Sequence, residues 1–573
     1  MKKLDKIILA SAVSLLSFLY YAPFLNNYFV WDDFCVMDNF ISGKGLSGDL
    51  RIFGHLLLWV DFLISKYDPL IYYLIRIGLH IANSGILFLL LYSLSNDRLF
   101  SLFTAVIFAA SGVGCDAILW KAAFLTSTGF FFYILVLYLY VEGNKKRNKL
   151  WHNLALAVFL LAMFNKEEIA SIPFMILFIE MLFFRDEAGA SRMTKIKRVL
   201  PYFLIIIMYI LLSIAAGRVL NIHQEQFDVF LSFRPLHTLL SGFTSFFISP
   251  GGKLSWENPF IYITAIFILL CFLLIRDRKW LLFGLGWTFV TFLPQSLTSL
   301  SRFDAPYLLN SISRHLYLPS VGPAILFSVM LQYLKGHLKL RSFVIASSLF
   351  FTVFIFINYE RVEARGKEWR EEGERMRKFL FSLKKIQPTL PENSYICLLA
   401  GPEGSYTLPS VRAFYKNPKI YWTDDPRKDA YIYLYFNDRV IDKHESIMRV
   451  IDAIQPDDIG YVLKFYDLKR MEKEKIEFLR SISLLYFKDA EIHFKLAITF
   501  RNMGMLDDAE TEFKAALAIT PMDMESHYYL GLLYALEKKY DQATGELQFV
   551  AGSKTLPYAP MADESLKSIR GAK

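Results

Sequence analysis

The sequence predicts a polytopic, all-α membrane protein with a C-terminal part outside the membrane. Of its 573 residues, 54% are hydrophobic and 52 are Phe, far more than a soluble chain of this length contains. Apolar residues gather in long segments before residue 358, and charged residues dominate the stretch that follows. Near the C-terminus a pattern of small and large residues recurs at a spacing of 34, which predicts paired helices.

The apolar segments predict about eleven transmembrane helices, because a helix of roughly 20 residues crosses a bilayer. Segments 99–110 and 150–164 are short, and losing both would keep the orientation of the other spans. Segments 52–64, which Asp61 interrupts, and 227–247 are expected to be helices in the membrane interface. The expected spans are 7–25, 70–94, 99–110, 117–141, 150–164, 169–184, 199–215, 260–275, 280–297, 314–334 and 343–357.

Basic residues predict which side each loop faces, because Lys and Arg concentrate in cytoplasmic loops. The N-terminus and the basic runs share one side, which we assign to the cytoplasm; the runs are 145–149, 192–198, 276–279 and 335–341. No Asn-X-Ser/Thr sequence occurs, which favours a bacterial inner membrane and a periplasmic C-terminal part. The extracytoplasmic side receives Asp32, Asp116, Lys166, the loop 218–258, Arg302 and everything after Ile357.

The predicted domains are a transmembrane domain at 1–358, a charged linker helix at 359–385, a small α/β insert at 386–470 and a repeat domain at 485–568. Within the insert, 395–400 and 430–436 are expected to be strands, since they are rich in Tyr, Ile and Leu and are bounded by turn residues. The residues between them, 401–428, are predicted to form a loop.

The C-terminal repeat matches the tetratricopeptide pattern and period, in which small residues let two antiparallel helices pack closely. Pro521 closes the first copy, and helices nearby, such as 467–485, are expected to complete the stack. The paired positions are His493, Leu496, Ala497, Phe500, Ala509, Phe513 and Ala516, which recur as His527, Leu530, Gly531, Tyr534, Ala543, Leu547 and Val550. We interpret the two His residues as repeat positions, not as ligands.

Two adjacent carboxylates, Asp32 and Asp33, follow the first span directly and come after the aromatic Trp31. They are candidates for chemistry at the membrane surface, although an Asp at this place can also simply cap a helix. Arg76 and His80 lie one turn apart on the second span, and we expect them to be structural partners inside the bundle. The sequence does not decide whether Cys35 and Cys115 form a disulfide.

Three further segments, together with the acidic pair, carry a resemblance to a known family. They are Asp116 to Trp120 (DAILW), Leu161 to Glu167 (LAMFNKE) and Arg314 to Gly322 (RHLYLPSVG). The chain resembles the transmembrane and tetratricopeptide-repeat O-mannosyltransferases and their bacterial relatives, within the GT-C superfamily of glycosyltransferases. It departs from the family pattern at Ser313, which replaces a Glu, and at His315, which replaces a Tyr. The His-Pro that precedes the family's Glu-Ala-Val segment is also missing.

The resemblance implies an inverting transferase that moves a hexose, with mannose a candidate, from a polyprenyl-phosphate sugar to a protein, glycan or lipid hydroxyl. By this resemblance Asp32 is the expected base, and Asp33 orients it or holds the acceptor. A guanidinium grips phosphate well, so Arg314 is the expected ligand of the donor phosphate. The alternatives for the phosphate are Lys166 and Arg302, and the other site candidates are Asp116, Glu167, His315 and Tyr317.

The expected partners are the lipid-linked donor, the acceptor, membrane lipid and a protein docked on the repeats, which offer a concave surface. The sequence does not decide whether a divalent ion binds near the acidic pair, because no ligand set is visible in it. The net charge of +9 is explained by the basic cytoplasmic loops, and no basic face on a soluble module points to nucleic acid.

Two other functions remain open from the sequence. A polytopic glycan polymerase or ligase would use a lipid-diphosphate donor, and it would show a large external loop rich in Arg and His. The loop 298–313 near Arg302 has only about 16 residues by the predicted span limits. A membrane-anchored repeat scaffold is the second alternative, and it would have no need for Asp32, Asp33 and Arg314 on one side of the membrane.

Overall fold

A computed structural model describes most of the chain. The described residues are 13–43, 50–184, 192–215, 259–299, 313–386, 388–400, 407–422, 430–436, 439–442, 490–502, 504–553 and 558–572. They form two compact units, one up to Met376 and one from Arg377 onward. The predicted interfacial helix at 227–247 and the predicted helix at 467–485 lie outside the described residues.

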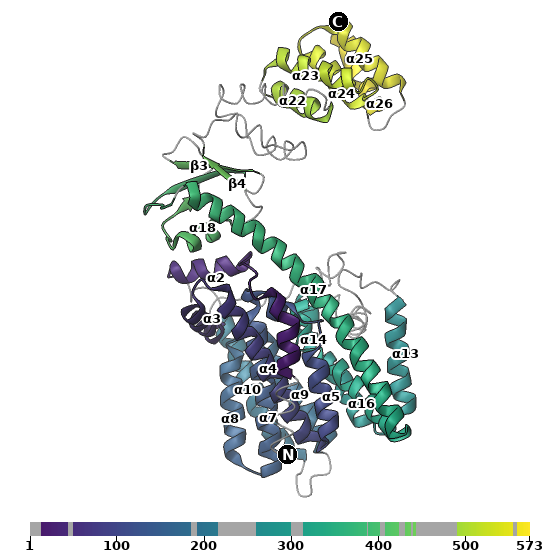
Figure 1. Cartoon of the computed structure of the whole chain (residues 1–573). Coiled ribbons are helices and arrows are strands. Elements are labelled where there is room, and N and C mark those ends of the chain that lie inside the picture. The colour runs from purple at the N-terminus through teal and green to yellow at the C-terminus, as the bar shows by residue number, and fades with distance from the viewer. Residues whose placement is uncertain are drawn as a thin grey trace. The chain divides into compact units, whose positions relative to one another are not determined.

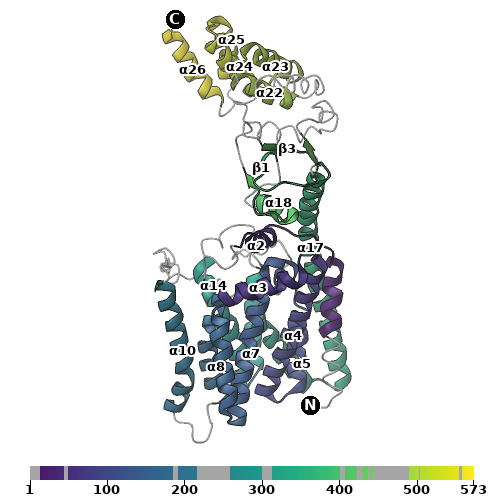
Figure 2. The same cartoon turned by 90° about the vertical axis from the view of Figure 1, so that its left-hand side faces the viewer.

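Each of the eleven apolar segments contains a helix in the structure, and these helices run side by side as a bundle (Figures 1 and 2). Four are long and apolar enough to cross a membrane, at Pro69–Ser95, Lys121–Lys146, Ile196–Ala215 and Leu340–Lys385. The helical membrane fold is confirmed to this extent, while the number of spans and their orientation stay predictions. The helices are 13–21 continued by η1 (Ala22–Phe24), α4 (Pro69–Ser95), α5 (Arg98–Ala109), α7 (Phe124–Lys146), α8 (Lys149–Met163), α9 (Ile172–Phe183), α10 (Arg192–Ala215), α13 (Pro259–Leu274), α14 (Arg278–Ser299), α16 (Val321–His337) and α17 (Leu340–Ile386).

Short elements gather at one end of the bundle. Helices α2 and α3 lie there, and the turn between α7 and α8 lies at the other end (Figures 1 and 2). Backbone hydrogen bonds join the short elements to the bundle, such as the 3.0 Å bond from Gly54 N–H to the carbonyl oxygen of Phe164. The short elements are α2 (Asp32–Ile41), α3 (Ile52–Ser65), α6 (Asp116–Leu119), η2 (Lys121–Ala123), η3 (Glu167–Ser171) and η5 (Ser313–Leu316).

Helix α3 occupies the segment predicted to lie in the interface. Its Asp61 points inward and is buried, together with Gly54 and Leu58. The opposite face is exposed and apolar, at helical spacing, and consists of Ile52, Leu56, Trp59, Val60, Leu63 and Ile64. This arrangement suits a helix that lies along a bilayer surface.

The last predicted span and the charged helix after it form one uninterrupted helix, α17. The separation near residue 358 is therefore wrong as a break in secondary structure. A stripe of residues at helical spacing continues past the apolar part and packs against the first loops. In it Asn358 accepts from the N–H of Gly112 at 2.9 Å, and the carbonyl oxygen of Gly366 accepts from the Asn27 amide at 3.0 Å. Gly373 approaches the backbone of Tyr28 so closely that a Cβ there would lie 3.1 Å from its nitrogen.

The second unit contains a four-stranded sheet in the order β2-β1-β3-β4. Strands β1 (Tyr395–Ala400) and β3 (Ala430–Phe436) pair in parallel and lie where strands are predicted. The short β2 (Tyr421–Trp422) adds in parallel to β1, and β4 (Arg439–Asp442) adds antiparallel to β3. The predicted loop 401–428 is wrong in part, because it also contains α18 (Thr407–Tyr415), which buries one face that includes Ser410 and Val411.

The described residues from 490 onward form five helices: α22 (Ala490–Asn502), α23 (Leu506–Ile519), α24 (Met524–Leu536), α25 (Tyr540–Gly552) and α26 (Tyr558–Ala572). Apolar side chains at the recurring positions form their common core, and α26 joins it through Ala562 and Leu566. Each recurring His contacts a Glu on the next helix. His493 Nδ1 lies 2.6 Å from Glu512, and His527 Nδ1 lies 2.6 Å from Glu546. The tetratricopeptide assignment of these helices stays a prediction.

The crossing of α14 and α16 provides a test of the bundle packing. A Cβ at Gly322 would overlap Thr288 Oγ1 and the carbonyl oxygen of Gly284. Since backbone cannot yield cheaply, Gly322→Ala should lower the free energy of unfolding by about 1–3 kcal/mol, measured as a lower Tm of the purified protein. The matched control is Gly336→Ala on the same helix, where nothing lies within 4 Å of an added Cβ. Equal melting temperatures for the two variants would contradict this packing.

Candidate active site

Asp33 is the structural centre of the first loop. It is buried, and its two oxygens accept from the backbone N–H of Val30 at 3.0 Å and of Ala122 at 2.7 Å. The Asp33 N–H in turn donates to the carbonyl oxygen of Val30 at 2.9 Å. Burial raises the pKa of Asp33, and the Lys121 charge and the two amides oppose that shift. The carboxylate thus fastens the start of α2 to η2, which is about ninety residues away in the sequence.

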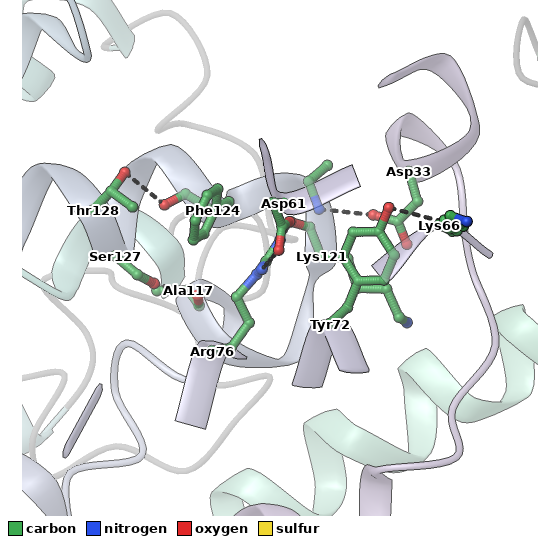
Figure 3. A network of polar contacts seen from close by, with 11 residues as sticks. Asp33, Asp61, Lys66, Tyr72, Arg76, Ala117, Lys121, Phe124, Ser127 and Thr128 are labelled. Carbon is green, nitrogen blue, oxygen red and sulfur yellow. Dashed lines mark hydrogen bonds and ion pairs between the residues drawn. The ribbon is translucent and has the colours of Figure 1, made fainter. Parts of the chain in front are cut away.

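Lys121 and Arg76 extend this polar network into the bundle (Figure 3). The Lys121 ammonium donates to the carbonyl oxygens of Asn27 at 3.2 Å and Tyr28 at 3.1 Å. Arg76 forms two hydrogen bonds to Asp61, at 3.0 and 2.7 Å, and donates to the carbonyl oxygen of Lys121 at 2.8 Å. Arg76 is therefore a structural partner, as predicted, and Asp61 joins α3 to α4.

Asp32 lies beside Asp33 but in a different environment. It is half-buried, while Asp33 is 3% exposed. Partial burial raises the pKa of Asp32 above its ordinary value, and the positive charge of Arg314 acts to lower it. Two adjacent carboxylates are thus divided between a buried structural position and an accessible one.

Arg314 belongs to a row of cations and aromatic rings. Its guanidinium carbon lies over the Trp120 ring, 4.3 Å from the ring centre, which is within cation–π distance. Trp120 stacks on Trp369 with 5.5 Å between ring centres, and Trp31 meets Trp369 edge to face at 5.2 Å. Arg314 Nε also donates to His315 Nε2 at 3.3 Å. Local sequence patterns could not predict this row, because Trp369 lies in the charged part of α17.

Asp116 serves to hold α17 against α6. It accepts from Arg365 Nε at 2.9 Å, from Arg365 Nη2 at 3.2 Å and from Trp369 Nε1 at 2.7 Å. Arg365 also lies over the Trp369 ring, at 4.7 Å from its centre. With three donors on a buried carboxylate, Asp116 is well suited to fix the Trp369 ring in place.

Lys166 and His315 meet at a carboxylate that sequence reasoning missed, Glu168. The Lys166 ammonium lies 2.6 Å from Glu168 and donates to Thr126 at 2.9 Å, and His315 Nδ1 lies 3.7 Å from Glu168. Burial acts to raise the pKa of Glu168, but Lys166 and His315 outweigh it and lower the pKa to about 2. Burial lowers the pKa of His315. Glu168 therefore stays ionised near neutral pH and binds Lys166.

Tyr317 is buried and connects its loop to α4. Its hydroxyl lies 2.6 Å from His80 Nδ1 and accepts from the Asn83 amide at 3.2 Å. Gly114 lies against it, since a Cβ there would come within 2.7 Å of the Tyr317 Cα. Both Tyr317 and His80 therefore hold the loop that precedes α16.

The structure brings most of the predicted site residues to one end of the bundle. Arg302 lies outside the described residues, and Glu167 begins η3 with a side chain that is not described. Cys35 and Cys115 are free thiols, so no disulfide joins them; Cys115 is packed in the bundle core while Cys35 lies on α2. Within the described part of the chain, no group of three or more His, Cys, Asp or Glu side chains could hold a metal ion.

Comparison with solved structures finds the oligosaccharyltransferase of Archaeoglobus fulgidus. The structure with a tethered acceptor peptide containing the NVT sequon has a TM-score of 0.41 and 12% identity, covering 73% of this chain and 64% of that one. The structure in complex with zinc and sulfate has a TM-score of 0.38 and 12% identity, covering 72% and 61%. This chain thus spans less than two thirds of the archaeal enzyme. A likeness this low carries no argument about the site, and no family model and no curated protein matches the chain.

The contact of Asp116 with Arg365 and Trp369, which holds α17 against α6, can be tested by removing its charges. Arg365→Ala leaves a buried carboxylate without its cation, so we expect the free energy of unfolding to fall by about 3–5 kcal/mol. Adding Asp116→Asn removes the buried charge and should recover part of the loss in Tm. Arg375→Ala on the same helix removes only an exposed pair with Glu372 and should cost less than about 1 kcal/mol. No recovery in the double variant would argue against this contact.

Proposed function

We propose that the protein is an inverting glycosyltransferase of the GT-C type that transfers a hexose from a polyprenyl-phosphate sugar to a hydroxyl group on the extracytoplasmic face. One observation carries the proposal: Asp32, an accessible carboxylate with a raised pKa, lies within electrostatic range of Arg314. Four other acidic groups described at this end of the bundle are engaged with cations or backbone amides. These are Asp33, Asp61, Asp116 and Glu168.

The reaction needs a base on one side of the anomeric carbon and a cation on the other. The acceptor oxygen forms a bond to the anomeric carbon, and the bond from that carbon to the phosphate oxygen breaks. Asp32 takes the acceptor proton, and the bonding electron pair leaves with the lipid phosphate. A positioned carboxylate base typically contributes roughly 10²–10⁴-fold in rate.

Arg314 is the residue we assign to the phosphate. Its guanidinium carbon lies over the Trp120 ring, and a guanidinium is the group that binds phosphate oxygens through parallel donors. Lys166 is the second candidate, and its ammonium contacts Glu168 and Thr126. The charge that develops on the leaving phosphate is stabilised by such a preorganised cation.

Three further candidates, Asp33, Asp116 and Tyr317, are positioning residues in this proposal. The Asp33 carboxylate accepts from the N–H of Val30 and from the N–H of Ala122 in η2, so it holds the turn that contains Asp32 against η2. Asp116 fixes Trp369, and Tyr317 fixes the loop that carries Arg314 and His315. A site held by such contacts keeps its reacting groups in place without help from the substrate.

The substrate and location follow from the same chemistry. A lipid-phosphate donor stays in the bilayer, which suits a site at the end of a membrane bundle. Mannose is the first sugar to test, on the family resemblance, and the C-terminal helices are proposed to dock the acceptor or a partner protein. The bacterial inner membrane with a periplasmic site is the proposed setting.

Sugar transfer in nanodiscs tests the proposal. Wild type should transfer labelled mannose, or glucose, from the polyprenyl-phosphate donor, and Asp32→Asn should lose at least about 100-fold in rate because it cannot take the proton. Asp68→Asn is the matched control: this exposed Asp caps α4 through Leu70 N–H at 2.9 Å, and Asn caps equally well. Full transfer by a folded Asp32→Asn would favour the scaffold alternative, and transfer only from a lipid-diphosphate donor would favour the polymerase or ligase.

The pH dependence of transfer tests the assignment of Asp32 and Arg314 together. Asp32 must be ionised to act as a base, so the rate falls as the pH drops through its pKa. Arg314 lowers that pKa, so Arg314→Gln should move the acidic limb of the rate profile to higher pH, besides lowering the rate. Lys335→Gln, at the end of α16, serves as a control that should leave the limb unchanged. A limb that stays in place in Arg314→Gln would show that another group titrates.

A further inference from the structure

Trp31 has an unusual backbone conformation. Its φ is 40° and its ψ is −115°, a region that bulky residues rarely adopt because it costs free energy. Hydrogen bonds on both sides enforce it: Val30 N–H donates to Asp33 Oδ2 at 3.0 Å, and Phe34 N–H donates to the Trp31 carbonyl oxygen at 3.1 Å. Glycine or Asn would fit this backbone with less strain, so the indole at this place needs an explanation.

The indole of Trp31 is the exposed end of the aromatic row. It is 37% exposed, while Trp369, which it meets edge to face, is buried and held by Asp116. The row continues through Trp120 to the Arg314 guanidinium. Arg314 and Trp31 are therefore the two ends of one rigid row, and Asp32 is joined directly to Trp31.

In the proposed reaction, the donor and the acceptor bind at different ends of this row. The phosphate of the donor belongs at Arg314, and the acceptor hydroxyl belongs at Asp32. The group that carries this hydroxyl then extends toward Trp31, at the other end of the row. An exposed, rigid indole presents a flat apolar surface with a polar edge, which matches the face of a pyranose ring, where C–H groups lie on one side and hydroxyls around the rim.

We propose that Trp31 is the platform on which the acceptor stacks, and that the acceptor hydroxyl therefore belongs to a pyranose sugar of a glycan or glycolipid. This inference rests on the proposed function, and it selects one acceptor class from those left open. A Ser or Thr side chain offers no ring to stack. Trp31 is a specificity residue in this account, and Asp32 remains the base.

The test uses octyl β-D-glucopyranoside and octyl α-D-mannopyranoside as acceptor probes, with a Ser- and Thr-containing peptide as comparison. The full-length protein in nanodiscs is examined in two ways, by transfer kinetics from the labelled polyprenyl-phosphate donor and by saturation-transfer NMR of the corresponding methyl glycosides without donor. The variants are Trp31→Leu and Trp31→Phe. The matched control is Trp59→Leu, which changes an exposed Trp on the outer face of α3.

We expect Trp31→Leu to raise the KM for the glycosides about tenfold with a smaller change in kcat, and to abolish saturation transfer to the ring C–H protons. Trp31→Phe keeps an aromatic face and should stay within about threefold of wild type. Trp59→Leu should match wild type in both measurements.

Three results would overturn the inference or separate it from the proposed function. Glycoside binding that is equal in wild type and Trp31→Leu, or reduced equally in Trp59→Leu, would make Trp31 an interface anchor and overturn the inference. Wild-type transfer to the peptide alone would also overturn it and leave the glycosyltransferase proposal standing. Glycoside binding that depends on Trp31, without transfer from any donor, would support the platform while the proposed function fails.

Discussion

The rest of this structure depends on the satisfaction of charged groups buried at the end of a membrane bundle. Away from water, each carboxylate and cation must find its partner inside the protein, or it destabilises the fold. Asp33, Lys121, Arg76 and Asp61 meet this requirement together (Figure 3). Because each uses a backbone group or a neighbour from another element, the network joins the first loop, α3, α4 and η2 into one body. Asp32 is the neighbour of Asp33 in the chain, so this network also fixes the position of its backbone.

Neighbouring residues of the same type have different tasks because their environments differ. Asp33 is enclosed by two amides, while Asp32, one residue earlier, remains partly open. The same holds for tryptophans: Trp369 is fixed by Asp116, whereas Trp31 projects from a constrained turn. Elements far apart in sequence thus form a rigid frame, and this frame positions the accessible side chains of Asp32 and Trp31.

Hydropathy and motifs predicted the apolar helices, the strands 395–400 and 430–436, and the acidic pair, because each depends on local pattern. They placed a break near residue 358, since hydropathy falls there, yet a helix continues wherever its buried face continues. The stripe of Asn358, Arg365 and Trp369 has helical spacing but lies among charged residues that mask it. The partner of Asp116 and the role of Glu168 depend on tertiary contacts, so no local signal could have revealed them.

The continuity of α17 also sets the length over which it contacts the first loops. Asn358 contacts Gly112, and Gly373 contacts Tyr28, and fifteen residues of helix rise about 22 Å. A headgroup layer is only about 5–8 Å thick on each side of a bilayer. The contacts of α17 with the first loops therefore extend over a length greater than one headgroup layer. One continuous helix therefore joins the apolar bundle to the polar loops at its end.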